Sequence, residues 1–311
     1  MRDTFVRAVL EEAKRDRNVE LITGDLGFGV LRPFWETVPD QFLNVGIAEQ
    51  LMTAMAAGMA LEGKTVFTYS IGNFPTLRCL EQIRNDCAYM NANVKIVCIG
   101  GGYTYGSLGM SHHATEDLAV MRALPNVAVF APADAAEAAA VAKAAVRYPG
   151  TCYIRLGRGG ERPVREQMPP FRVGKALEVR RGAQVAIFTT GAIYEEAELA
   201  RRILEEAGIF PTMYTFPTVK PLDEAVILSC AAGHRLIVTC EEHNAQGGFG
   251  SAVADVLAQA GSGTRLLKIA VDDRYCSVVG DQKHLRSACG IDGQTIAKRI
   301  LEKLEGEAGC K

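Results

Sequence analysis

The chain of 311 residues is 48% hydrophobic and carries a formal net charge of −2. This length is enough for two domains, and a near-neutral charge without a run of Lys or Arg argues against nucleic acid or a membrane surface as the main partner. We expect no membrane span, because no apolar run reaches 18 residues free of charge, and no signal peptide, because residues 1–20 have the pattern of a charged amphipathic helix.

Cysteine and histidine spacing predicts reduced thiols and no metal held by this chain. None of the nine cysteines forms a CxxC pair, and their scattered positions are typical of a cytoplasmic protein. The five histidines show neither HExxH nor Cys/His zinc spacing. The cysteines are Cys79, Cys87, Cys98, Cys152, Cys230, Cys240, Cys276, Cys289 and Cys310.

Helices and strands are expected to alternate in residues 1–160. An opening helix has one apolar face, and Asp134 and Glu137 have the spacing of a capping box at the start of a later helix. This alternation predicts a mostly parallel sheet covered on both faces. The opening helix carries Phe5, Val6, Val9 and Leu10; further helices are expected at residues 47–61, 73–90, 118–124 and 133–148, and strands at residues 19–23, 42–45, 64–69, 94–99, 127–130 and 152–156.

The helix at residues 47–61 contains one acid in an otherwise apolar element. Leucines and methionines lie among alanines and a glycine, so the helix lacks a polar face and is expected to be buried. Glu49 lies in its first turn, where the helix N-terminus favours the anion and burial favours the protonated acid. The spacing alone leaves two interpretations of Glu49 open: a functional acid, or a structural residue that caps the helix or pairs with an Arg.

Irregular polar segments follow two of the expected strands. Asp25 comes after the strand at 19–23, which is where α/β sheets bind ligands, and it is alternatively a turn residue. Residues 100–117, GGGYTYGSLGMSHHATED, contain five glycines and the pair His112 and His113. Such a segment after a buried strand is typical of a binding-site loop, and the alternative is a Gly-rich surface loop.

The composition changes to Gly, Pro and charge at residues 157–172, and we place a linker at residues 161–172. A second, smaller α/β unit is expected at residues 173–311. The sequence therefore predicts an α/β protein with two mostly parallel-sheet domains, residues 1–160 and 173–311. In the second unit, strands are expected at residues 185–189, 210–215, 235–240 and 266–269, and helices at residues 195–207, 221–230, 251–259 and 293–304.

Motifs in both halves resemble the thiamine-diphosphate transketolase family. The first half contains VGIAEQ and AAGMALEGKTVF, and the second contains TTGAIYEEAELARRILEEAGI, TVKPLD and TCEEHNAQGGFGSAVADVL. The resemblance covers nearly the whole chain. It implies the pyrimidine-binding domain of the thiamine-diphosphate fold at residues 1–160, followed by the transketolase C-terminal domain.

The resemblance also implies that one domain lies on another polypeptide. The family holds the cofactor's diphosphate and a divalent metal with a GDG motif and a later Asn, whereas Gly24-Asp25-Leu26 lacks the third Gly. The chain therefore resembles the C-terminal subunit of a split transketolase. The implied partner is an N-terminal subunit with the GDG motif and Mg²⁺ or Ca²⁺, which shares thiamine diphosphate with this chain. A homodimer or an α2β2 assembly is expected.

Residue by residue, the resemblance implies a cofactor site. Glu49 matches the glutamate that hydrogen-bonds N1′ of the aminopyrimidine and favours the tautomer that activates the cofactor. Phe74 matches an aromatic residue that stacks on the pyrimidine, with a core Phe at helical spacing as the alternative. The other implied cofactor residues are Ile71, in a wall that is often aromatic, the strand-end Asp25, and Gly46, which interrupts the strand before the helix.

A substrate site is implied in the same way. His112 matches a histidine that faces the substrate and is expected to shuttle protons. His113 is grouped with the substrate-binding residues, although it is expected to point elsewhere. Arg158 or Arg155 matches an Arg that binds a substrate phosphate, and Arg2 matches a second one; an Arg fork suits a phosphate or a sulfonate.

The sequence departs from ordinary transketolases at positions that contact the sugar. Gly100 stands near the position of a histidine, Ser107 and Leu108 stand near that of an acidic pair, and Gly29 stands at that of a phosphate-contacting serine. The resemblance therefore implies intact cofactor activation with altered recognition of the sugar.

The implied activity is transfer of a two-carbon ketol unit from a ketose or ketose phosphate to an aldehyde. One alternative is the beta-type subunit of a two-component enzyme that decarboxylates a 2-oxoacid and transfers the acyl unit to a small or sugar acceptor. A second alternative is a non-catalytic scaffold or regulatory subunit, and the presence of Glu49 and Phe74 argues against it.

Overall fold

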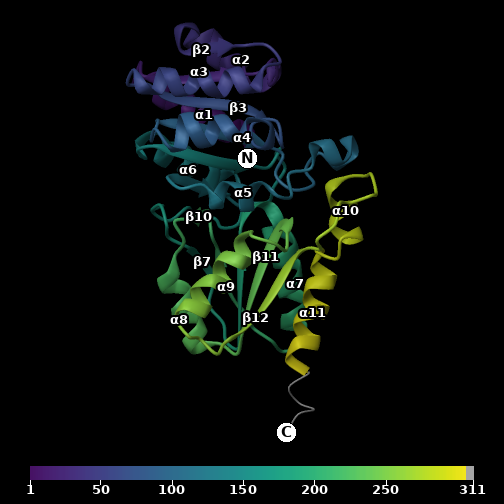
Figure 1. Ribbon diagram of the computed structural model, residues 1–311. Coiled ribbons are helices and arrows are strands. Elements are labelled where there is room, and N and C mark those ends of the chain that lie inside the picture. The colour runs from purple at the N-terminus through teal and green to yellow at the C-terminus, as the bar shows by residue number, and fades with distance from the viewer. Residues whose placement is uncertain (306–311) are drawn as a thin grey trace.

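Two α/β domains make up the computed structural model, which describes residues 1–305. In Figure 1 the first domain, purple to teal, lies above the second, green to yellow, and α10 and α11 run along one side of the second domain. The expected fold class, two α/β domains with mostly parallel sheets, is confirmed. Cys310 lies outside the described residues, and the eight described cysteines are free thiols.

The first sheet has seven strands in the order β10-β5-β6-β4-β3-β1-β2. Its strands are parallel except β10, which is antiparallel to β5. The central strands β4 and β6 are buried along their whole length, as expected for a parallel sheet covered on both faces. The bounds are β1 Val19–Thr23, β2 Phe42–Asn44, β3 Thr65–Ile71, β4 Val94–Ile99, β5 Val127–Phe130, β6 Thr151–Leu156 and β10 Thr218–Lys220.

Helices cover both faces of this sheet. On one face α1 and α6 pack together over a core that includes Phe5, Phe67 and Val141. On the other face lie α3, α4 and α5, with Met52 and Leu118 in their core. The helices are α1 Arg2–Ala13, α2 Phe28–Thr37, α3 Glu49–Leu61, α4 Leu80–Gln82, α5 Asp117–Ala123 and α6 Ala135–Arg147.

The second sheet has five strands in the order β12-β11-β8-β9-β7. They are parallel except β7, which is antiparallel to β9. Helices α7 and α11 pack together beside this sheet, and α8 packs with α9. The bounds are β7 Leu177–Arg180, β8 Val185–Thr189, β9 Thr212–Thr215, β11 Leu236–Asn244, β12 Arg265–Val271, α7 Tyr194–Glu206, α8 Glu224–Gly233, α9 Phe249–Gln259, α10 Gln282–Ala288 and α11 Gly293–Glu305.

Long periodic segments were predicted well, and short ones were missed. The strands at residues 19–23, 94–99, 127–130 and 185–189 have the expected bounds. The capping box is confirmed: Asp134 Oδ1 accepts from Glu137 N at 2.8 Å, and Glu137 Oε2 accepts from Ala133 N at 2.7 Å. The unpredicted elements are α2, β7, β10 and α10.

The helix expected at residues 73–90 is wrong over its first part. Pro75 has no N–H to donate, and the chain forms a turn after β3. A short 3-10 turn at Leu77–Cys79, α4 and a π-helix at Ile83–Ala88 follow. Phe74 and Arg78 therefore lie in irregular backbone between β3 and α4.

Two segments join the domains more closely than the sequence indicates. β10 lies in the range expected for the second domain but pairs with β5 of the first sheet. In the expected linker, Arg165 lies 2.7 Å from Glu137 Oε1 and donates to Thr215 Oγ1 at 3.0 Å. These contacts attach the linker to a helix of the first domain and a strand of the second.

The expectation that α3 is buried on all sides is wrong for this chain alone. Its buried face includes Glu49, Met52 and Ala56, whereas Leu51 is 51% exposed and Leu61 is 55% exposed. Because these exposed side chains are apolar, the helix has a face suited to contact with another subunit. Among residues 1–305, every helix falls short of the length and apolar character needed to cross a bilayer.

Candidate active site

The expected site residues follow the carboxyl ends of neighbouring strands in the first sheet. β1 pairs with β2 and β3, and β3 pairs with β4, all in parallel. Asp25 follows β1, Glu49 follows β2, Phe74 follows β3 and His112 follows β4. Parallel strands bring these ends to one side of the sheet, which is where open α/β sheets bind ligands.

Glu49 is a buried acid with one cationic partner. It is the first residue of α3, and its side chain is 4% exposed. Arg78 Nη1 donates to Glu49 Oε2 at 2.9 Å, and the Arg78 side chain is 48% exposed. The backbone at Gly24 passes close by, since a Cβ there would lie 3.7 Å from Glu49 Cγ. The Glu–Arg pair of the structural interpretation is therefore present, and it lies at the ligand-binding side of the sheet.

Phe74 presents an aromatic ring beside this pair. The guanidinium carbon of Arg78 lies 4.7 Å from the Phe74 ring centroid. The His112 ring meets Phe74 edge-on at 5.2 Å with an interplanar angle of 72°. Phe74 is half-buried and lies in a turn, so the alternative of a core Phe at helical spacing is wrong. We call Glu49, Arg78, Phe74 and His112 the Glu49 cluster.

Arg78 is the member of the Glu49 cluster that the sequence interpretation missed. Its position four residues after Phe74 corresponds to one turn of the expected helix, which would place it among ordinary surface charges. The turn after β3 instead directs its side chain towards Phe74 and Glu49. A basic residue close to the expected stacking aromatic was the available signal.

The other expected cofactor residues lie on the same side of the sheet. Asp25 has a positive φ of 57° and accepts from Asn44 Nδ2 at 3.2 Å, so it is both a strand-end residue and a turn residue. Gly46 has a φ of 72°, a conformation that favours Gly, and donates to Asn44 Oδ1 at 3.0 Å. Ile71 is the half-buried last residue of β3. Asn44 thus links the turns that carry Asp25 and Gly46.

The two loop histidines have different environments. His112 is half-buried, and its Nδ1 lies 3.0 Å from Ser111 Oγ. His113 is 3% exposed and meets the Tyr103 ring edge-on at 5.0 Å. Burial lowers the pKa of His113 below its ordinary value. His113 thus points into the protein, as expected, and this position does not support its grouping with the substrate-binding residues.

The structure separates the two candidate phosphate-binding arginines. Arg155 is 5% exposed, and its Nη2 donates to Ala114 O at 2.7 Å and to Glu242 O at 2.8 Å. Its Nε also lies 2.9 Å from Asp117 Oδ2. These contacts occupy Arg155 within the fold. Arg158 is exposed, so it is the one of the two that can reach a ligand.

Arg158 and Arg2 lie near one tyrosine. Burial raises the pKa of Tyr105, and the positive charges of Arg2 and Arg158 oppose that rise. Arg2 is on α1, its side chain is 25% exposed, and its Nε lies 3.0 Å from Asp3 Oδ1. The two exposed candidates for an anionic substrate group are therefore close to Tyr105, which belongs to the histidine-containing loop.

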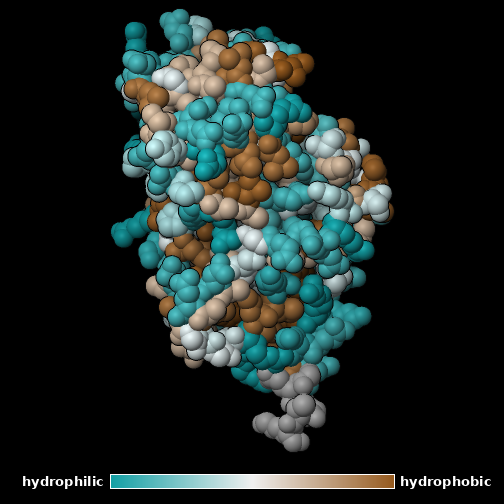
Figure 2. Space-filling view, in the orientation of Figure 1, coloured by the Kyte–Doolittle hydropathy of each residue, from teal (hydrophilic) through white to brown (hydrophobic). Residues whose placement is uncertain are grey.

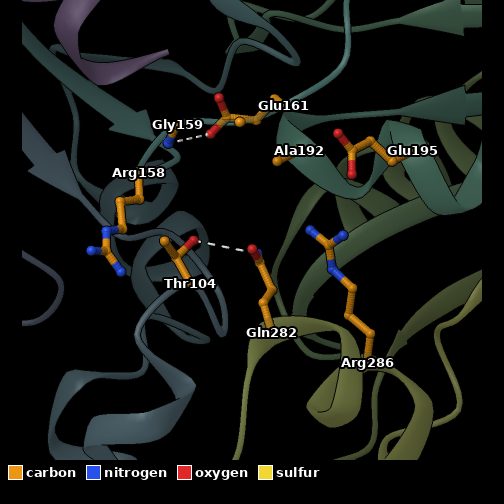
Figure 3. Close-up of a pocket in the computed structure, with 9 residues that line it drawn as sticks. Thr104, Arg158, Gly159, Glu161, Ala192, Glu195, Gln282 and Arg286 are labelled. Atoms are coloured by element: carbon orange, nitrogen blue, oxygen red, sulfur yellow. Dashed lines mark hydrogen bonds between the residues drawn. The ribbon is translucent and has the colours of Figure 1, made fainter.

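A cavity of about 270 Å³ lies between the domains beside Arg158 (Figure 3). Thr104 and Arg158 come from the first domain, and Gln282 and Arg286 come from α10 of the second. Gln282 Nε2 donates to Thr104 Oγ1 at 3.3 Å across the cavity. Arg158 and Arg286 lie on opposite walls, so positive charge approaches the cavity from both domains.

Glu242 joins the histidine-containing loop to the second domain. It is 3% exposed and accepts from Tyr103 N at 2.9 Å and from Arg286 Nη2 at 2.7 Å. A Cβ at Gly102 would lie only 2.5 Å from Glu242 Cδ, so this close approach requires glycine. The sequence interpretation missed Glu242, whose motif it used only as a sign of resemblance.

Comparison with known proteins matches both halves of the chain. Residues 1–162 match the family model of the transketolase pyrimidine binding domain, and residues 174–296 match that of the transketolase C-terminal domain. One of the two subunits of the apulose-4-phosphate transketolase from Actinobacillus succinogenes is 34% identical over 285 residues, which cover 91% of each chain. The 6-deoxy-6-sulfo-D-fructose transketolase subunit SqwH of a Clostridium species is 33% identical over 306 residues, covering 98% of this chain and 94% of the relative.

Solved structures include similar chains of two lengths. A chain described as a split gene transketolase, inactive beta4 tetramer, has a TM-score of 0.87 and 33% identity, with 97% of this chain and 96% of that chain covered. A transketolase from Campylobacter jejuni shares the fold with a TM-score of 0.78 and 18% identity. In that second comparison 97% of this chain covers only 46% of the other.

Proposed function

The chain belongs to the transketolase family, and from this premise we propose that it is the C-terminal subunit of a two-polypeptide transketolase. The complete enzyme transfers a two-carbon ketol unit from a ketose or ketose phosphate to an aldehyde. The observation that carries this proposal is the buried carboxyl of Glu49 beside the Phe74 ring, at the ligand-binding side of the first sheet.

A second polypeptide completes the proposed enzyme. The chain covers 96% of the split-gene relative but only 46% of the Campylobacter transketolase. The partner is an N-terminal subunit with a GDG motif, and it binds the diphosphate of the cofactor and Mg²⁺ or Ca²⁺. Within residues 1–305, no group of three or more His, Cys, Asp or Glu side chains is arranged to hold a metal ion. The eight described free thiols support a cytoplasmic location.

The residues present fit the aminopyrimidine end of thiamine diphosphate. When bound, this cofactor supplies a carbon that adds to a carbonyl and stabilises the charge left by cleavage of the neighbouring C–C bond. Glu49 holds a ring nitrogen through a shared proton, which a carboxyl in a site of low dielectric constant does well. Phe74 supplies an aromatic face, and Ile71, Asp25 and Gly46 border the same site.

The substrate side is assigned to His112 and the two exposed arginines. His112 lies edge-on against Phe74, so it is within reach of a substrate bound next to the cofactor ring, and it moves protons at substrate oxygens. Arg158 and Arg2 bind the anionic end, because a guanidinium can hold two oxygens of a phosphate or sulfonate at once. Arg155 positions the loop that carries His112 through its bond to Ala114 O.

A donor assay tests the proposed reaction. We expect the chain, mixed with the partner encoded beside it and with thiamine diphosphate and Mg²⁺, to transfer a ketol unit from a ketose phosphate to an aldehyde. The product is a ketose two carbons longer than the aldehyde. Release of carbon dioxide from pyruvate, without any reaction of the ketose, would instead support the 2-oxoacid enzyme.

The proposed assembly uses the exposed apolar face of α3. Figure 2 shows apolar surface on the first domain in the region where Figure 1 places α3 and α4. We propose that a second copy or the partner subunit covers this surface, giving a homodimer or an α2β2 complex. The exposed apolar residues in this part of the chain are Leu43 (37%), Ile47 (79%), Leu51 (51%), Leu61 (55%), Leu77 (41%), Tyr89 (82%) and Met90 (50%).

Leu51→Asp is expected to dissociate this assembly. A buried charge without a partner costs several kcal/mol at an interface, whereas in the free chain Leu51 is half-exposed. Light scattering at micromolar concentration should therefore report a monomer for the variant and an oligomer for the wild type. Phe210→Asp is the matched control, because Phe210 is 58% exposed and lies in the second domain. A wild-type monomer, or an unchanged mass for Leu51→Asp, would contradict the proposed interface.

A further inference from the structure

Arg78 contacts both groups that the proposed function assigns to the aminopyrimidine ring. Its Nη1 donates to the Glu49 carboxylate at 2.9 Å, and its guanidinium carbon lies 4.7 Å from the Phe74 ring centroid. A guanidinium is planar, donates hydrogen bonds within its plane and stacks on aromatic faces. An aminopyrimidine held by the same carboxylate and ring must meet the same two requirements. We propose that Arg78 is a placeholder that occupies this position in the free subunit and leaves when the cofactor ring binds; the inference rests on the proposed function.

The free subunit has a physical reason to contain such a residue. Glu49 is 4% exposed. A buried carboxylate without a hydrogen-bonded cation is strongly disfavoured. The hydroxyl of Thr53 donates to the backbone oxygen of Glu49 and leaves its carboxylate without help. Arg78 therefore stabilises Glu49 until the cofactor ring arrives.

The Arg78 side chain can leave without rearrangement of the backbone. It is 48% exposed and can turn into water. Its turn is held by other groups: Thr76 Oγ1 donates to Gly72 O at 3.3 Å, Cys79 Sγ donates to Phe74 O at 3.2 Å, and Gln50 Nε2 donates to the Arg78 backbone oxygen at 3.2 Å. Departure of the guanidinium therefore breaks its contacts with Glu49 and Phe74 and leaves these bonds intact.

Arg155 in the same domain shows the contrast. It is 5% exposed, and its guanidinium contacts Ala114, Glu242 and Asp117. Moving it would break contacts between three segments of the chain. Arg78 instead combines a strong ion-pair contact with access to solvent, which is the combination that an exchangeable group needs.

Competition from Arg78 predicts how its removal changes cofactor binding. The apparent dissociation constant equals the intrinsic constant divided by the fraction of the protein in the binding-competent state. If Arg78 covers Glu49 in about nine molecules of ten, its removal tightens binding about tenfold. A residue that helped to hold the cofactor would have the opposite effect on affinity.

Calorimetric titration of thiamine diphosphate into the assembled complex with Mg²⁺ tests the proposal. We expect Arg78→Met to bind the cofactor about tenfold more tightly than the wild type. In the free subunit we expect Arg78→Met to lower the urea midpoint of unfolding, and to have little further effect in a Glu49→Gln background. Arg84→Met is the matched control, because Arg84 is exposed in the following π-helix.

The outcomes separate this inference from the proposed function. Weaker or unchanged binding by Arg78→Met, with normal binding by the wild type, would overturn the placeholder role alone. A wild-type complex that does not bind thiamine diphosphate would overturn the proposed function as well. Arg78→Gln is a second variant with the same expected tightening, for use if Arg78→Met does not assemble.

Discussion

Glu49→Gln is expected to lower turnover of the reconstituted enzyme by about 10²- to 10⁴-fold, the usual contribution of a positioned proton-transfer group. Gln has the size and shape of Glu but cannot share a proton in the way a carboxyl does. The fold should remain, because the change adds no volume and the released Arg78 is half-exposed and can be solvated. The measurements are turnover with a ketose donor and the thermal midpoint of the free subunit.

Glu62→Gln is the matched control for this experiment. Glu62 is exposed and lies directly after α3, so its replacement should leave both turnover and melting unchanged. Unchanged turnover in Glu49→Gln would favour the non-catalytic scaffold. A large fall in the melting midpoint would show that the pair with Arg78 is primarily structural.

Arg155→Met is expected to destabilise the protein by about 3–5 kcal/mol, the cost of removing one partner of a buried ion pair. The change leaves Asp117 buried and charged without its cation, and it removes donors from Ala114 O and Glu242 O. Asp117 also accepts from Tyr153 at 2.5 Å, but one neutral donor is not sufficient for a buried charge. Urea unfolding followed by circular dichroism measures the loss.

A double variant tests the cause of this destabilisation. Adding Asp117→Asn removes the stranded charge, so Arg155→Met with Asp117→Asn should lose less stability than the sum of the two single variants. Arg202→Met is the control; its surface pair with Glu198 should contribute no more than about 1 kcal/mol. Additive losses in the double variant would show that Arg155 acts through packing and not through Asp117.

The fold could be predicted from sequence because its signals are local. Strands β1, β4, β5 and β8 are apolar runs with clear limits, and they appear with the expected bounds. Short edge elements were missed for the same reason: β7 and β10 have only four and three residues, too few for a periodic pattern. The helix expected after β3 failed because the apolar spacing was followed through Pro75.

The candidate site was predicted in part. Asp25, Glu49, Phe74 and His112 do lie at one side of the first sheet, because each follows a neighbouring parallel strand. The choice between Arg155 and Arg158 needed burial, which their sequence neighbourhood does not reveal. Glu242 and Arg286 were missed because their pair joins residues 44 positions apart.

Sequence alone determined the family resemblance, the order of strands and helices in two α/β domains, and the acid at the start of α3. These features are written in contiguous residues. Tertiary structure decided that Arg78 lies on Glu49 and Phe74, that Arg155 is buried against Asp117, and that α3 exposes an apolar face. Those outcomes depend on which distant segments meet and which surfaces stay uncovered, and the free energies of burial and ion pairing are set only by that meeting.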